Sequence, residues 1–473
     1  MAELLYAVPQ GSTGNNCITV RSVLKYLDMK KAELKTEKKQ NKGNRHSTNR
    51  RTKNILRWDK LDNTAHLFPV IAGESMTNTY RIAAELTEEV DGALLQEALN
   101  LVLPKFDLFN VRLRTGFFWY YFEENTNKPP IVKEEHTYPC RYILTNKNRA
   151  YMFRVRYYKR RIILEVFHVL TDGMGGVNFL KELTYQYLRL KYPHLREKAG
   201  DTLSTDTSLN REDSFLRNYR KSAKKGYHSK KAYEIKGEHL DKEELGIIHG
   251  YVKIPALKEV CHKYGYSINE YLVATYVWSI YKECLHGMTS EYAIRAAVPV
   301  NLRPFFDSVT TKNFFAMVSA ELVPDEENLT YEQVMNRVVT SLRSQINKEH
   351  LEELFSYNVS NQRNLFARAV PLLLKNIAIR LVYTQSALAN TTTITNIGNI
   401  RLEPEYEPYV KEFVAFLAMS KGQLLKATIC SYQDTLVVSF SSVLAEPHVQ
   451  RAFFRQLAKD GLEVTIESNG VYV

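Results

Sequence analysis

The spacing of hydrophobic and polar positions changes several times along the chain, which predicts alternating strands and helices. Residues 161–168 (RIILEVFH) are rich in β-branched and aromatic types, as is typical of a buried strand. After Gly175 and Gly176, apolar residues recur every three or four positions, which predicts a helix with one buried face. A strand, His168, a tight Asp-Gly turn and a helix therefore follow one another, in a layout typical of an active site.

Local signals predict further elements. Asp91 can cap a helix that ends at Pro104, and Gly116 separates two short strands of a hairpin. Ser267 and Glu270 form a capping box at the start of a long helix. The other expected strands are 80–86, 151–158, 249–255, 293–302, 391–400, 424–432, 435–442 and 462–468, and the other expected helices are 331–347, 365–387 and 447–461.

Two apolar segments have more than one interpretation. The run FFWYYF, which begins at Phe117, is expected to lie in the core and on a sheet face rather than in a binding site. The helix expected at 365–387 is amphipathic, and its apolar stripe could line an acyl site or contact a membrane. A stripe that faces the core is the default expectation.

His168 is the candidate reactive residue in this strand, turn and helix. Histidine can take up and return a proton near neutral pH, so a histidine at a strand end is a candidate general base. The expected strand places His168 on the same side as an apolar row, and the loss of hydration there favours its neutral form. Asp172 can hold the turn by binding a cation or backbone groups. The alternative is a satisfied core histidine followed by an ordinary Asp-Gly turn.

The segment FHVLTDG resembles the H-x-x-x-D-G signature of the coenzyme A-dependent acyltransferase superfamily. This superfamily includes chloramphenicol acetyltransferase-like enzymes, plant acyltransferases, alcohol acetyltransferases and the condensation domains of peptide synthetases. Condensation domains usually begin the motif with two histidines, and Phe167 in the first place favours a free-standing acyltransferase. Residues 297–306 and 395–400 resemble the Arg-bearing segment and the late Asn/Gly loop of the family. The D-F-G-W-G box of the plant enzymes is absent from the sequence.

The resemblance covers roughly residues 57–473, and it implies an α/β fold with two chloramphenicol acetyltransferase-like subdomains and an active-site tunnel between them. It also implies transfer of an acyl group, expected to be acetyl, from coenzyme A to an alcohol, with His168 as the general base. Arg303 would hold Asp172 through paired hydrogen bonds and so lock the turn, although an ordinary surface arginine is the alternative. The other residues implied in the site are Gly173, next to the pantetheine arm, and Asn396 and Thr393, as donors to the oxyanion.

Length and charge set the expected organisation. A chain of 473 residues fits two domains of ordinary size. The net charge is +12, and residues 1–60 hold 14 Lys and Arg against 5 Asp and Glu. This placement is typical of solvated segments rather than of a nucleic-acid-binding face. We expect a basic, largely disordered segment at 1–53, an N-terminal acyltransferase subdomain at 54–240 and a C-terminal one at 241–473.

The remaining composition narrows the class. The sequence has no apolar run long enough to span a membrane and no secretion signal, so a cytoplasmic protein is expected. The five cysteines lack C-x-x-C spacing, so neither a metal site nor a disulfide framework is expected. The expected partners are acyl-CoA as co-substrate and a small alcohol or amine acceptor, and an acidic carrier protein is a further candidate. Two other functions stay open: an amide-forming or carrier-protein-dependent condensation enzyme, and a non-catalytic ligand-binding protein.

Overall fold

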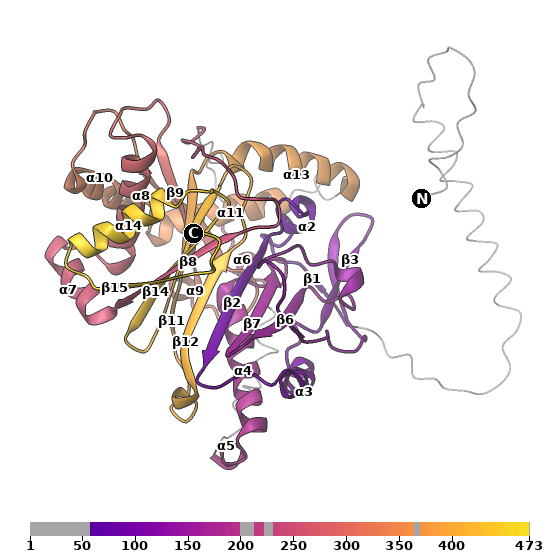
Figure 1. Ribbon diagram of the computed structural model, residues 1–473. Helices are drawn as coiled ribbons and strands as arrows, with labels where there is room; N and C mark the ends of the chain where they lie inside the picture. The colour runs from indigo at the N-terminus through magenta and orange to yellow at the C-terminus, as the bar shows by residue number, and fades with distance from the viewer. Residues whose placement is uncertain (1–56, 199–211, 222–229, 364–368, 473) are drawn as a thin grey trace, which may run out of the picture. The chain divides into compact units, whose positions relative to one another are not determined.

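The computed structural model describes residues 57–198, 212–221, 230–363 and 369–472. The predicted disordered segment at 1–53 lies outside the described residues. Three sheets organise the described chain (Figure 1).

A five-stranded sheet contains the strand that leads to His168. Its strand order is β12-β2-β7-β6-β5, and the pairs are antiparallel except for β5 with β6. The expected hairpin around residue 160 is present as β6 and β7. The strand bounds are β2 Thr79–Leu86, β5 Lys133–Glu134, β6 Phe153–Tyr158, β7 Arg161–Phe167 and β12 Val410–Leu417. The edge strand β12 comes from the C-terminal part of the chain, so the N-terminal sheet is completed by a distant segment.

Two helices cover this sheet. α4 (Gly173–Lys191) packs on β2 and β7, and α3 (Gly92–Val102) packs on α4. The Asp91 side chain accepts hydrogen bonds from the backbone of Ala93 and Leu94, as the expected cap requires. Small residues and aromatic rings fill the space between the helices and the sheet, and Phe109 and Phe179 stack with their ring centroids 4.0 Å apart.

A three-stranded sheet lies beside the first, in the order β1-β4-β3. Its strands are β1 (Trp58–Lys60), β3 (Val111–Thr115) and β4 (Tyr120–Glu124), and the last two form the expected hairpin around Gly116. The expectation that the FFWYYF run lies in the core is wrong for its first residues. Phe122 is buried, whereas Phe117 and Phe118 lie at the turn of the hairpin and are exposed.

A seven-stranded sheet forms most of the C-terminal half, in the order β10-β9-β11-β13-β14-β8-β15. β11 runs parallel to β9 and β13, and the other pairs are antiparallel. The strand bounds are β8 Gly246–Lys253, β9 Ile294–Asn301, β10 Phe315–Leu322, β11 Thr392–Ile400, β13 Leu425–Tyr432, β14 Thr435–Ser442 and β15 Val464–Ser468. β12 packs against β13 and β14, which brings the two large sheets together.

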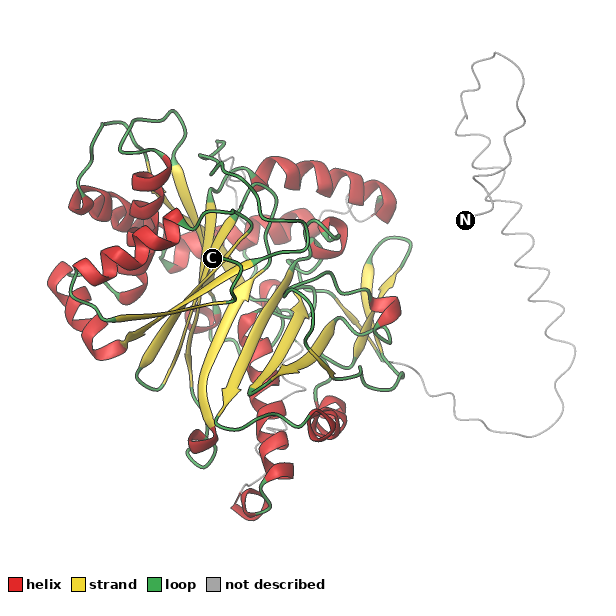
Figure 2. Cartoon of the chain, in the orientation of Figure 1, coloured by secondary structure: helices red, strands yellow, loops and turns green. Residues whose placement is uncertain are grey.

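Four helices form the cover of this sheet: α7 (Ile254–Tyr264), α8 (Ile268–Cys284), α10 (Tyr331–Gln345) and α14 (His448–Lys459) (Figure 2). The predicted capping box at Ser267 starts α8, and Thr330 and Gln333 form a second box at α10. α8 is buried along most of its length, because β9 and β10 lie under it and α10 and α14 lie beside it.

The helix α13 (Leu372–Ala387) departs from the default expectation of a core-facing stripe. Leu372 is its one buried residue, and most of its apolar side chains are exposed. Polar side chains of α13 bond to the rest of the protein. The apolar stripe on the other side of the helix therefore faces solvent. The shorter or less central helices are α2 (Phe68–Ile71), α5 (His194–Lys198), α6 (Ser214–Arg217), α9 (Arg303–Phe306) and α11 (Lys348–Arg363).

This mixed architecture agrees with the predicted α/β class. No helix in the described parts of the chain is long and apolar enough to cross a bilayer. The division of the chain at residue 240 stays a prediction.

Candidate active site

His168 follows β7 directly, at the point where the chain leaves the five-stranded sheet. Its backbone N–H donates to the carbonyl of Asn78, 2.9 Å away, which extends the β2–β7 pairing by one residue. The imidazole ring stacks on Phe68, with ring centroids 4.8 Å apart, and meets the edge of Tyr80 at 5.1 Å. Two aromatic rings therefore orient a side chain that is still partly exposed.

Asn313 determines which nitrogen of His168 carries the proton. The Oδ1 atom of Asn313 lies 3.1 Å from His168 Nδ1, and its Nδ2 donates to Asp62 Oδ2 at 3.0 Å. Because the Asn313 amide is oriented by its bond to Asp62, Oδ1 is left as an acceptor, so Nδ1–H of His168 is the donor. The other nitrogen, Nε2, then carries the lone pair, and none of the described residues forms a hydrogen bond with it.

Burial lowers the pKa of His168 below its usual value, while the negative charge of Asp172 opposes that shift. The bond to Asn313 also favours the protonated ring, and the Lys426 ammonium disfavours it. Burial acts in the opposite direction on Asp62, whose pKa rises to about 7. The imidazole is thus neutral at pH 7, which is the form that can accept a proton.

The predicted pair of Asp172 and Arg303 is present. Arg303 Nη2 lies 2.8 Å from Asp172 Oδ2, and that oxygen also accepts from the backbone N–H of Phe314 at 3.3 Å. The other oxygen of Asp172 accepts from the Gly175 N–H at 3.3 Å and caps α4. The sequence suggests that Arg303 lies at the end of a strand. In the structure it lies at the first position of α9.

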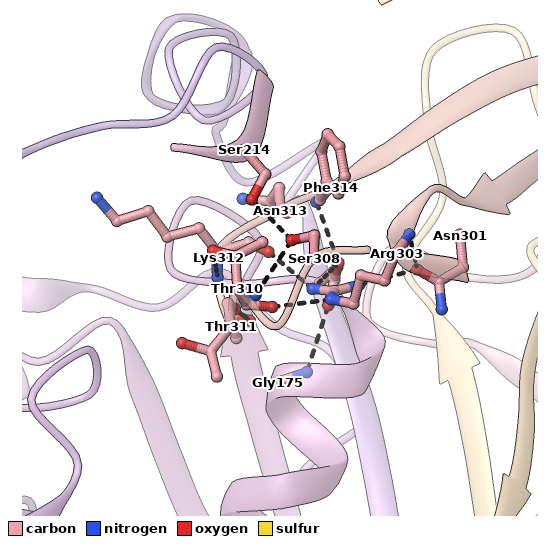
Figure 3. A network of polar contacts seen from close by, with 12 residues as sticks. Gly175, Ser214, Asn301, Arg303, Ser308, Thr310, Thr311, Lys312, Asn313 and Phe314 are labelled. Atoms are coloured by element: carbon pink, nitrogen blue, oxygen red, sulfur yellow. Dashed lines mark hydrogen bonds and ion pairs between the residues drawn. The ribbon is translucent and has the colours of Figure 1, made fainter. Parts of the chain in front are cut away.

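Arg303 also holds the loop that carries Asn313. Its Nε and Nη2 donate to the carbonyls of Thr310 and Lys312, both at 2.8 Å (Figure 3). Thr171, next to Asp172, donates through its hydroxyl to the carbonyl of Thr311. The ion pair therefore fixes both the turn after His168 and the loop that supplies the acceptor for Nδ1.

Two glycines of the turn are required by packing. A Cβ on Gly175 would lie 1.9 Å from Thr171 Oγ1, and one on Gly176 would lie 2.7 Å from the Tyr80 hydroxyl. A Cβ on Gly173 would meet Ile397 at 3.5 Å, an ordinary van der Waals distance. The close approach of helix and sheet thus explains Gly175 and Gly176, whereas nothing in the surrounding protein requires a glycine at 173.

The two residues expected as oxyanion donors lie on β11, and both side chains bond to residues other than His168. The Thr393 hydroxyl is buried and donates to Gln423 Oε1 at 2.8 Å. Asn396 is exposed, and its Oδ1 accepts from the N–H of Gly398 at 2.8 Å, at the bulge between β11 and β13. Of the six expected site residues, the structure ties His168, Asp172 and Arg303 into one network and places Gly173 next to β11 through Ile397.

Three polar residues near this network could not be identified as site residues from the sequence. Asp62 and Asn313 are 251 residues apart, so only the fold brings them together. Lys426 is buried on β13, opposite Thr393, and donates to the Ala418 carbonyl at 2.8 Å and to Ser420 Oγ at 2.5 Å. Burial lowers the pKa of Lys426 to about 7. Among the described residues, no group of three His, Cys, Asp or Glu side chains could hold a metal ion.

No family model and no curated protein matches the sequence, but the fold is similar to solved structures. TRI101 of F. sporotrichioides, solved with coenzyme A and T-2, is 13% identical, with a TM-score of 0.59 over 86% of this chain and 99% of that one. TRI3, the trichothecene 15-O-acetyltransferase of Fusarium sporotrichioides, is 10% identical, with a TM-score of 0.54 over 85% and 94%.

The condensation domain of the Monacolin K polyketide synthase MokA is 10% identical, with a TM-score of 0.53 over 86% of this chain and 97% of that one. The matches thus include an acetyltransferase and a condensation domain, and each covers at least 85% of this chain. The chain therefore shares the fold of these solved structures, which consists of two chloramphenicol acetyltransferase-like subdomains.

Proposed function

We propose that the protein is an acyltransferase that moves an acyl group, acetyl in the simplest case, from coenzyme A to an alcohol. The observation that carries this proposal is a neutral, partly accessible histidine whose Nδ1 proton is committed to Asn313. That arrangement leaves Nε2 as a base. The similarity to TRI101, which was solved with coenzyme A, and to TRI3, an O-acetyltransferase, supports the donor and the type of acceptor.

His168 Nε2 would remove the proton of the acceptor hydroxyl while that oxygen attacks the carbonyl carbon of the thioester. The tetrahedral intermediate then loses the thiolate as its C–S bond breaks, and the imidazolium returns the proton to the thiolate. The products are an ester and free coenzyme A, with no net change in protons. The thioester is already activated, so no covalent intermediate with the protein is needed.

Asp172 and Arg303 act as positioning residues in this scheme. Neither needs to touch the substrate, because their ion pair holds the turn after His168 and the loop of Asn313. The absence of a side chain at Gly173 would leave room for the pantetheine arm. The oxyanion would be stabilised by the exposed Asn396 amide, and Thr393 could contribute only by leaving its bond to Gln423.

The test is release of thiol from acetyl-CoA across a panel of alcohols and amines, with and without His168→Ala. Release that depends on an alcohol and is lost in the variant supports the proposal. Release with amines alone, or only from an acyl group carried on a carrier protein, would assign a condensation-type reaction instead. A protein that binds a ligand tightly and releases no thiol with any donor would be a non-catalytic binding protein, and the proposal would fail.

A further inference from the structure

The helix α13 has a polar side and an apolar side. In an ordinary surface helix the apolar side faces the protein, whereas in α13 the polar side does. Asn376 Nδ2 donates to the Tyr120 hydroxyl at 2.8 Å, and Arg380 donates to the Val70 carbonyl at 3.0 Å. The Tyr383 hydroxyl lies 3.1 Å from Met76 Sδ. These contacts tether the helix near α2 (Figure 1) and β4 and determine which of its sides faces outward.

The outward side is a continuous apolar stripe. Its members follow the pattern i, i+1, i+4, i+8 and i+9, which places them on one side of a helix. We call it the α13 apolar face, and its large side chains and their exposed fractions are Leu373 73%, Leu374 55%, Ile377 56%, Leu381 65% and Val382 64%. Soluble proteins rarely leave such a contiguous row of large aliphatic side chains in water.

A second apolar segment adjoins the start of this face. The turn between β3 and β4 carries Phe117, which is 71% exposed, and the Leu372 N–H donates to the Phe117 carbonyl at 2.9 Å. Lys375 donates to the carbonyl of Phe118 at 3.1 Å and lies over the ring of Trp119 at 3.6 Å. Phenylalanine, tryptophan and lysine next to a leucine-rich stripe are the residue types that settle at the boundary between headgroups and acyl chains.

The apolar surface also continues inward. A cavity of about 380 Å³ lies beside α13, and Leu374 belongs both to its wall and to the α13 apolar face. The other walls include Trp119, Ile379 and the ring of His66, whose pKa burial lowers to about 4, so that this imidazole is neutral. The wall of the cavity is therefore mostly uncharged, with Lys375 as its cation, and Leu374 joins it to the α13 apolar face.

The charged side chains of α13 are both positive. The sequence has no Asp or Glu between Glu353 and Glu403, and α13 itself holds Lys375 and Arg380. Trp58 is 65% exposed on β1, in the same small sheet as the Phe117 turn. An apolar stripe on a helix whose charged residues are both basic matches the acyl chains and the anionic headgroups of a bilayer.

The size of the face argues against a second copy of the chain. A 16-residue helix is about 24 Å long and about 10 Å wide, so its outer side covers on the order of 240 Å². A stable protein dimer buries about 800 Å² on each partner. We propose that the α13 apolar face and the Phe117 turn dock the protein on an anionic lipid bilayer, with the helix lying in the plane of the interface.

The test is flotation of the purified full-length chain with vesicles of phosphatidylcholine alone and of phosphatidylcholine mixed with phosphatidylglycerol. The variant L373Q/I377Q/L381Q replaces three exposed residues by a good helix former, so its fold and melting temperature should be retained. The matched control, M288Q/V323Q/I466Q, replaces three apolar residues that are exposed elsewhere on the body. The wild-type protein and the control should float with the mixed vesicles, and the α13 variant should lose at least about tenfold in its partition coefficient.

Equal flotation of the α13 variant and the wild type would overturn the proposal. It would also fail if the wild type did not float, or if it bound both kinds of vesicle alike. Elution of the wild type as a dimer that only the α13 variant disrupts, with no binding to vesicles, would assign the face to a second copy. Acyl transfer to a water-soluble alcohol in the absence of vesicles reports on His168 alone, so failure of docking and failure of the proposed function are distinguishable.

Discussion

His168 and His249 are associated with different sheets. In both residues Nδ1 contacts a neighbouring polar side chain, but the two side chains differ in their exposure to solvent. His249 lies within β8, its Nδ1 is 2.8 Å from Ser439 Oγ, and the residue is 5% exposed. His168 comes after the last residue of its strand and stays partly exposed. Desolvation keeps both rings neutral, and only access to substrate makes one of them a candidate base.

The electrostatic surroundings also differ. Burial lowers the pKa of His249 to about 3, with the positive charges of Arg161 and Arg81 acting in the same direction. Burial lowers the pKa of His168 too, but Asp172 and Asn313 oppose it. A core histidine is thus kept permanently neutral, whereas a general base must remain able to hold a proton for part of each cycle.

The largest expected effect separates the two histidines by activity. His168→Ala should lower turnover by roughly 10² to 10⁴, which is the usual contribution of a general base, while the melting temperature changes little. His249→Ala should keep turnover at the optimal pH and lower the melting temperature instead. The measurement is acceptor-dependent thiol release next to thermal unfolding, and full activity in the His168 variant would make it a second core histidine.

The ion pair next to His168 should have a large effect on stability as well as activity. Removing one partner of a buried pair leaves the other charge uncompensated, so Asp172→Ala or Arg303→Ala should cost about 3 to 5 kcal/mol of unfolding free energy. The double variant should lose less than the sum of the two single losses. Denaturant titrations of all four proteins measure this coupling, and strict additivity would show that the ion pair does not form in solution.

Asn313→Asp should change the pH dependence of the rate. A carboxylate next to Nδ1 favours the imidazolium, so the acidic limb of the rate profile should move to higher pH by about one unit or more. The neighbouring Asp62, with its pKa already near 7, can supply the proton that Asn313 Nδ2 donates in the wild type. Asn100→Asp on the exposed surface of α3 adds the same charge and should leave the profile in place. An unshifted limb in Asn313→Asp would remove Asn313 from the proposed site.

The prediction with the smallest expected effect on turnover concerns the dependence of stability on pH. The folded state holds His249 neutral, so between pH 6.5 and 3 the unfolded chain binds the proton and the folded chain does not. Stability should therefore fall with decreasing pH, and His249→Gln should remove about 1.4 kcal/mol per pH unit of that slope. The exposed His136 serves as the control position, and the slope of His136→Gln is measured under the same conditions. An identical slope in wild type and His249→Gln would mean that His249 is solvated.

Local signals explain what could be predicted from the sequence. Asp91, Gly116 and the Ser267 box each act within a few residues, so the elements they start were placed correctly. The strands β10 and β12 and the helix α11 were not anticipated. β10 is rich in alanine and serine, which have weak strand propensity, and β12 depends on β2, a partner far away in sequence.

The same limit applies to the site. His168 and Asp172 are four residues apart, so they form a motif that can be identified in the sequence. The family resemblance indicated Arg303 as the partner of Asp172. The bond from His168 to Asn313 joins residues 145 positions apart, and no periodicity or spacing marks it. The orientation of α13 was missed for a related reason, because an amphipathic pattern shows that a helix has two sides and does not show which side meets the protein.

The pairing of β12 with β2 has a consequence for synthesis of the chain. The Thr87 side chain and the Tyr409 carbonyl meet at the end of this pair although they are 322 residues apart. β2 therefore leaves the ribosome long before its partner exists, and one edge of the N-terminal sheet stays open meanwhile. The N-terminal half is consequently made with an unpaired strand edge, which favours association with other chains until β12 has been synthesised.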